Sequence, residues 1–124
     1  MRQETIHMLE EFNISSNEEF QLSNKYKAYE EHIKKSISGE GMVGENNYLI
    51  LWRKSEIEEL NDAYEVQEFL NNIFLVGSDG GDIAYGIDTK GQYVEVPFIG
   101  MTDEEVKIVA KNFDDFIYYI WRKE

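Results

Sequence analysis

The chain of 124 residues contains no cysteine, and this absence removes several kinds of chemistry at once. Disulfides, zinc–thiolate sites and thiol nucleophiles are excluded, and the composition is compatible with a reducing compartment. Proline occurs once, at Pro97, and no Pro/Gly-rich linker divides the chain. The length is that of one ordinary domain, which can bury a core without covalent staples.

Long apolar runs are missing as well. Nowhere does the sequence hold about eighteen consecutive apolar residues, the length that marks a membrane span. The N-terminal MRQETIHMLEEF has no apolar run of signal-peptide length. The sequence therefore predicts a cytoplasmic protein that does not enter the membrane.

Positive charge is scarce. Twelve bases face 25 acids, which leaves a net charge of −13. Between Lys54 and Lys90 there is no Lys or Arg, but there are nine acids: Glu56, Glu58, Glu59, Asp62, Glu65, Glu68, Asp79, Asp82 and Asp88. Such a surface repels nucleic acid and anionic lipid, and it attracts a basic partner. A purely solubilising role for the charge is the alternative.

Helical patterns are predicted at both ends of the chain. Residues 1–17 are a polar segment, irregular or with a short helix, and residues 18–124 are a single domain. Residues 18–37 repeat apolar side chains at helical spacing, with Asn17 as N-cap and Gly39 and Gly41 after the end; these side chains are Leu22, Tyr26, Tyr29, Ile33 and Ile37. A final helix is predicted to start at a Thr102–Glu105 capping box. Its apolar stripe is Val106, Val109, Ala110, Phe113, Phe116, Ile117 and Ile120.

The middle of the chain predicts strands around a third helix. Residues 48–52, 73–77, 82–88 and 92–96 read as strands, and the turn Thr89-Lys90-Gly91 makes a hairpin of the last two. A capping box at Ser55 opens a helix with an acidic outer face and, on its inner face, Ile57, Leu60, Ala63 and Tyr64. A further helical turn covers residues 65–70. The predicted fold is α+β: one mostly antiparallel sheet of about four to six strands, flanked by N-terminal helices and covered by a C-terminal amphipathic helix.

The stretch VGSDGGDIAYGID, residues 76–88, poses the main functional question. It matches neither a dinucleotide-binding loop, nor a Walker loop, nor an EF-hand, whose closing glutamate would fall on Lys90. Asp79-Gly80-Gly81 between two apolar runs is typical of a hairpin turn. A turn that also presents Asp79 and Asp82 to a partner or a cation stays open.

Several motifs in order along the chain resemble the SUKH superfamily, in particular the branch of fungal cell-wall-synthesis regulators and many bacterial immunity proteins. They are YLILW, N-x-x-Y from Asn61 to Tyr64, GSDGGDIAYGID, VPFIGM and NFDDFI, within residues 20–120. The resemblance implies that residues 18–124 form a SUKH-like domain. It also implies that Gly77, Ser78, Asp79, Gly80 and Gly81 join central strands and that Phe113 and Phe116 pack the closing helix. The chain departs from the common pattern at Ser23 and at Asn71-Asn72, where prolines are frequent.

Catalytic signatures are absent from the sequence. His7 and His32 lie in no metal motif, and no G-x-S-x-G elbow occurs. We therefore expect a protein that is not an enzyme and that uses no cofactor or metal.

Three functions are weighed. The resemblance and the charge favour an immunity protein that neutralises a basic toxin domain, with a nuclease as the favoured toxin class. The alternatives are a regulatory adaptor that binds cellular proteins, and a small metal-binding protein or enzyme using Asp79, Asp82 and Asp88. The partner-binding candidates are Trp52, Glu56, Glu58, Glu59, Asp62, Glu65, Glu68, Asp79 and Asp82. Trp52 is either an interface anchor or a core residue.

Overall fold

The strands of the sheet lie side by side in the order in which the chain forms them. The structure, a computed structural model, describes residues 1–15 and 19–124. All strand pairings are antiparallel. The seven strands are β1 (Phe12–Ile14), β2 (Gly39–Val43), β3 (Asn47–Leu51), β4 (Ile73–Ser78), β5 (Ile83–Asp88), β6 (Tyr93–Pro97) and β7 (Lys107–Ala110). The α+β antiparallel prediction is confirmed, with seven strands instead of four to six.

Three of these strands were not predicted, and β2 shows why. Gly39 and Gly41 were expected to end a helix, but they lie inside the strand at a φ of 151°. A Cβ on Gly39 would lie 2.2 Å from the carbonyl oxygen of Asn13 in β1. Glycine is therefore needed for the close approach of β1, although strand interiors usually disfavour it.

The continuous helix predicted over residues 18–37 is wrong. The structure has a 3-10 helix, η1 (Asn24–Tyr29), followed by α2 (Glu30–Lys34), and described residues 19–23 are not helical. The backbone N–H of Leu22 donates to Glu30 at 2.9 Å, and that of Ser23 donates to Glu58 at 2.7 Å. These carboxylates satisfy amides that a longer helix would have used. Asn17, the predicted N-cap, lies outside the described residues.

The single long helix predicted from Thr102 onward is also wrong. Thr102 precedes a short 3-10 helix, η2 (Asp103–Glu105), and β7 follows where the long helix was expected. Helix α5 (Phe113–Trp121) begins only after Asn112, whose Oδ1 accepts the N–H of Asp115 at 2.9 Å. The apolar stripe on this helix is confirmed by its buried residues: Phe113, Phe116, Ile117 and Ile120.

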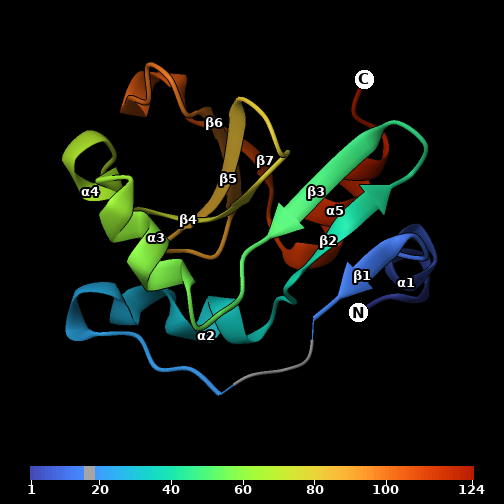
Figure 1. Cartoon of the computed structure of the whole chain (residues 1–124), viewed down its shortest axis with the longest axis horizontal. Helices are drawn as coiled ribbons and strands as arrows, with labels where there is room; N and C mark the ends of the chain where they lie inside the picture. The colour runs from blue at the N-terminus through green and yellow to red at the C-terminus, as the bar shows by residue number, and fades with distance from the viewer. Residues whose placement is uncertain (16–18) are drawn as a thin grey trace.

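Two apolar clusters lie on the two faces of the sheet, because successive strand residues point to opposite sides. Phe74 and Val76 of β4 join the cluster beneath α5, η1 and α2. Ile73 and Leu75 of the same strand join the second cluster. The second cluster also holds Val66, because α4 (Val66–Phe69) follows α3 (Ile57–Ala63) across that side of β4. Figure 1 shows α3 and α4 well apart from α5, which lies behind β2 and β3.

A polar clasp joins the two ends of the chain. Helix α1 (Gln3–Met8) packs against α5. Asp114 accepts hydrogen bonds from the Arg2 backbone N–H at 2.8 Å and from the Thr5 hydroxyl at 2.6 Å. The Arg2 guanidinium lies 2.6 Å from Asp115. Within residues 1–15 and 19–124, no helix combines the length and apolarity needed to cross a membrane.

Candidate functional site

The glycine-rich stretch forms the turn between β4 and β5. Asp79 Oδ1 accepts the backbone N–H groups of Gly81 at 2.8 Å and Ile83 at 3.2 Å. Ser78 Oγ accepts the N–H of Gly80 at 3.1 Å, and Gly80 has a φ of 83°. The turn interpretation of Asp79-Gly80-Gly81 is therefore confirmed.

Neither Asp79 nor Asp82 is among the residues that line the hollows beside α3 and α4. The turn lies beside β3, since a Cβ on Gly80 would lie 3.4 Å from the Tyr48 ring. Asp82 is exposed, and Asp79 is committed to the turn through Oδ1. Among the described residues, no three or more His, Cys, Asp or Glu side chains form a group that could hold a metal ion.

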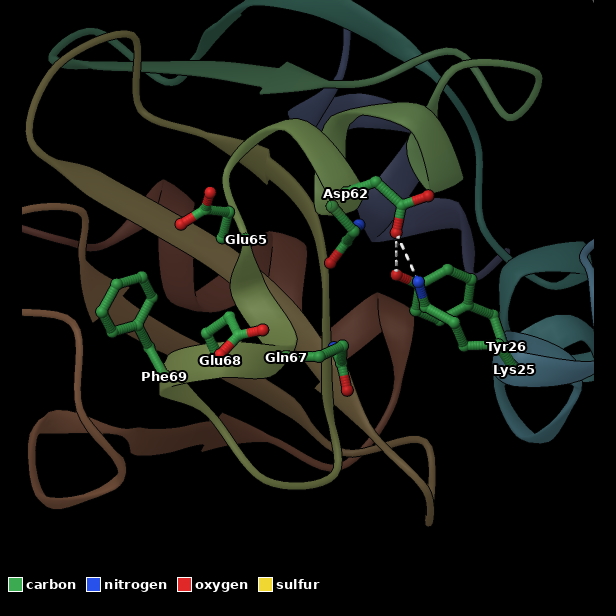
Figure 2. A pocket seen from close by; sticks show the side chains of 8 residues that line it. Lys25, Tyr26, Asp62, Glu65, Gln67, Glu68 and Phe69 are labelled. Atoms are coloured by element: carbon green, nitrogen blue, oxygen red, sulfur yellow. Dashed lines mark hydrogen bonds and ion pairs between the residues drawn. The ribbon is translucent and has the colours of Figure 1, made fainter.

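The predicted acids of α3 and α4 gather around one hollow of about 510 Å³ (Figure 2). Asp62 of α3, Glu65 between the two helices and Glu68 of α4 line it. The remaining lining residues are Lys25, Tyr26, Asn61, Gln67 and Phe69. Glu58 and Glu59 line a neighbouring hollow with Asp62, and Glu56 is exposed at the start of α3. Glu56 also occupies the N-cap position predicted for Ser55.

Asp62 is a structural contact as well as a surface charge. Its Oδ1 accepts the Lys25 ammonium at 2.8 Å and the Tyr26 hydroxyl, which ties η1 to α3. The hydrogen bond from Lys25, and then that from Tyr26, lowers the pKa of Asp62. Burial and the carboxylate of Asp62 raise the pKa of Tyr26 to about 12.

Replacing Asp62 by asparagine tests this contact through pH. Because the folded state lowers the pKa of Asp62, its stabilisation is present above the ordinary value of 3.8 and is lost as pH falls through the lowered pKa. The substitution Asp62→Asn should cost at most about 1 kcal/mol at pH 7, since the pair is half exposed. Urea unfolding at pH 7 and at about pH 3 should show that the difference in unfolding free energy between the parent and the variant shrinks at the lower pH. An equal difference at both pH values would contradict a stabilising role for the ionised Asp62 carboxylate.

The other acids divide by whether they have a partner. Glu58 accepts the Ser23 N–H, so it serves the fold. Glu59, Glu65 and Glu68 are exposed, and their side chains make no hydrogen bond or ion pair with any residue that the structure describes. Glu65 sits between α3 and α4 with a left-handed φ of 55°, which bends the chain there. Together with Glu56, which is likewise exposed at the start of α3 and makes no side-chain contact of this kind among the described residues, these carboxylates are available to a partner.

A second, apolar hollow adjoins the acidic one. It has a volume of about 490 Å³ and is lined by Tyr64, Phe69, Phe98, Gly100, Met101 and Thr102. Phe69 lines both hollows and is 51% exposed, and Tyr64 is 48% exposed. The predicted inner face of the third helix included Tyr64, and no site role was predicted for Phe69, so sequence reasoning missed both as site residues. The actual buried residues of α3 are Ile57 and Asn61.

Trp52 lies behind this apolar hollow. Its ring stacks on Tyr64 at 6.0 Å between centroids, and Tyr64 contacts Phe98 at 5.2 Å. Trp52 is partly buried and packs against both apolar clusters. It therefore holds Tyr64 in place. Of the strand tyrosines, Tyr85 and Tyr93 are buried.

The chain matches no protein-family model and no curated protein. Function is therefore inferred from this surface and from the motifs in the sequence.

The buried side-chain amide of Asn61 attaches α3 to β4. β3 pairs with β4 only at Ser78 and Gly77, which leaves the start of β4 without a partner strand on that edge. Asn61, fully buried, takes the place of that strand at Leu75: its Nδ2 donates to the Leu75 carbonyl at 2.8 Å, and its Oδ1 accepts the Leu75 N–H at 2.9 Å. Gln67 likewise donates to the Ile73 carbonyl at 2.9 Å. The N-x-x-Y motif thus places Asn61 inside and Tyr64 outside.

Proposed function

We propose that the protein is a non-enzymatic binding protein of the SUKH type, an immunity protein that neutralises a basic toxin domain. The observation that carries the proposal is the group of exposed, unpartnered carboxylates along α3 and α4, among them Glu59, Glu65 and Glu68. The motifs shared with the immunity-protein branch of that superfamily give the proposal its biological context.

The charge distribution explains why a nuclease is the expected toxin class. An enzyme that binds the phosphate backbone needs Lys and Arg at its substrate surface. A protein with a net charge of −13 is attracted to such a surface before contact is made, and this raises the association rate. Bound there, the acidic face of α3 and α4 would cover the basic site and exclude the nucleic acid.

A charge-removal experiment tests the electrostatic role. The variant Glu59→Gln, Glu65→Gln, Glu68→Gln should associate with a captured basic partner about tenfold more slowly at low salt. Its melting temperature should stay within about 2 °C of the parent value, because exposed unpaired charges contribute little to stability. Stopped-flow association and thermal unfolding measure the two quantities.

The matched control removes the same charge elsewhere. Glu4, Glu11 and Glu45 are exposed acids of α1, the segment before β1, and the β2–β3 turn. Their triple replacement by glutamine should slow association far less. Equal slowing by both triple variants would show that only net charge matters.

The partner itself is to be captured from lysate and culture medium of the native host, with mass spectrometry at low and high salt. The expected result is one basic protein that is retained in stoichiometric amount and whose binding is weakened by salt. Several intracellular proteins at sub-stoichiometric amounts would contradict the immunity function and favour a regulatory adaptor.

A further inference from the structure

The apolar hollow beside α4 has the form of a binding pocket for one side chain. Its volume of about 490 Å³ lies within the range of small-molecule sites, and its lining is mainly aromatic and aliphatic. Space is open above Gly100, where an added Cβ would meet no atom within 4 Å. Ile99, next to it, is 86% exposed. Exposed apolar side chains gathered at one place mark an interaction site.

The walls of the hollow are already held in position. Trp52, Tyr64 and Phe98 form a continuous series of ring contacts, and Met101 is buried in the cluster beneath. Little side-chain entropy remains to be lost at these rings when a partner binds. Phe69 is the exception: no ring contact holds it in the described structure, so it can adjust to an incoming side chain.

The charge around Phe69 limits what can enter. Glu65 and Glu68 line the acidic hollow together with Phe69 (Figure 2), and they have no cationic partner within the described chain. The Lys25 ammonium is paired with Asp62. A second copy of this chain would bring the same acids to a two-fold interface, and like charges oppose that contact. The complementary ligand is a cation next to an apolar group.

We propose that this two-part surface docks a segment of the partner protein in which an apolar side chain is adjacent to arginine or lysine. The apolar side chain enters the hollow between Tyr64, Phe69 and Phe98, and the cation meets Glu65 and Glu68. This inference rests on the proposed function, because it names where a basic partner would be held. Buried aromatic anchors and neighbouring charge pairs are the usual centre of such interfaces.

Defined peptides test the site without knowledge of the toxin. Acetyl-Arg-Trp-Arg-amide is titrated into the ¹⁵N-labelled full chain and followed by amide NMR spectra, with acetyl-Glu-Trp-Glu-amide and acetyl-Trp-amide as comparisons. We expect a millimolar dissociation constant for the cationic peptide, with shifts centred on Tyr64, Phe69, Gly100 and Thr102. Both comparison peptides should bind at least about tenfold more weakly.

Two variants separate the parts of the site. Phe69→Ser should weaken the cationic peptide at least about tenfold, and the half-exposed position leaves the fold intact, as the dispersion of the spectrum will show. The double variant Glu65→Gln, Glu68→Gln should reduce the affinity for the cationic peptide to that for acetyl-Trp-amide and leave the latter unchanged.

Several outcomes would overturn the proposal. They are shifts centred elsewhere, no shifts at about 10 mM peptide, and equal binding of the acidic peptide. Tight binding of acetyl-Trp-amide alone would indicate a small neutral ligand instead. Concentration-dependent shifts of the same amides without peptide would indicate a second copy. Failure here with successful capture of a basic partner would reject only this docking site, whereas peptide binding together with capture of several sub-stoichiometric intracellular proteins would reject only the immunity function.

Discussion

Replacing Asn61 by leucine is expected to lower the free energy of unfolding by about 3–5 kcal/mol. The two side chains have the same branched shape and the same number of heavy atoms, and the substitution removes three hydrogen bonds: one to Ile57 O at 2.9 Å and two to Leu75 at 2.8 and 2.9 Å. Leu75 is fully buried, and its N–H and C=O would be left without partners on that edge. Each unsatisfied buried group costs about 1–3 kcal/mol. Urea unfolding followed by circular dichroism measures the loss.

Gln67 provides the matched control for Asn61. It makes one comparable bond, to Ile73 O at 2.9 Å, but its side chain is exposed and water can replace it. Gln67→Leu should therefore cost only about 1 kcal/mol. If Asn61→Leu cost no more than this control, the buried amide would not be the link that holds α3 on β4.

Replacing Gly77 by alanine is expected to cost about 3 kcal/mol. The new Cβ would lie 2.0 Å from the carbonyl oxygen of Ile50, which is backbone and cannot rotate away. β3 and β4 are joined by only two residue pairs, and Gly77 is in one of them, opposite Leu51. Overpacking alone costs about 1–3 kcal/mol, and separation of the strands adds lost hydrogen bonds. Amide hydrogen exchange should accelerate first in β3 and β4.

Gly81 in the same motif is the control for Gly77. The nearest atom to its added Cβ is Asp79 Oδ1 at 3.5 Å, which is ordinary contact, and its φ is not positive. Gly81→Ala should therefore change stability by less than about 1 kcal/mol. A similar loss of stability at the two glycines would show that the flexibility of the turn matters, and not the close approach of the β3 backbone to Gly77.

The elements that the sequence predicted well have local causes. The strands β3, β4, β5 and β6 carry continuous or alternating apolar residues, and the turns between β4 and β5 and between β5 and β6 are specified by aspartate and glycine. In the second turn Asp88 accepts the N–H groups of Lys90 and Gln92, both at 2.9 Å. These interactions span only a few residues, so a single sequence contains the information.

The elements that it predicted poorly depend on distant partners. The interior of β2 contains glycines because β1 passes close to it, and no pattern in the neighbouring sequence predicts that approach. β7 lies in a stretch whose apolar spacing suits a helix, but Val106, Ile108 and Val109 are β-branched and the edge of β6 was open to pair. The helical spacing of residues 22–33 correctly identified buried side chains while giving the wrong backbone over residues 19–23.

The candidate site shows the same division. Composition was enough to select the acids of α3 and α4. It could not separate Glu58 and Asp62, which bind the segment around η1, from Glu65 and Glu68, because that difference lies in contacts about 35 residues away along the chain. Tyr64 is exposed although helical spacing would put it on the side of Asn61, because α3 ends at Ala63 and Tyr64 is the C-cap residue. A polar residue on the apolar side of a helix is a signal that periodicity based on hydrophobicity overlooks.

The ordered path of the sheet has a consequence for synthesis on the ribosome. From β2 onward each strand pairs with the strand made just before it, and β4, β5 and β6 are joined by tight turns. The hairpins β2–β3, β4–β5 and β5–β6 can thus form in the order of translation with little loop entropy to overcome, whereas helices separate β1 from β2 and β3 from β4. The clasp of Arg2 and Thr5 onto Asp114 differs, since it joins residues 112 and 109 positions apart. While the nascent chain is still short of α5, α1 lacks the element that it contacts most, so its docking follows the synthesis of α5.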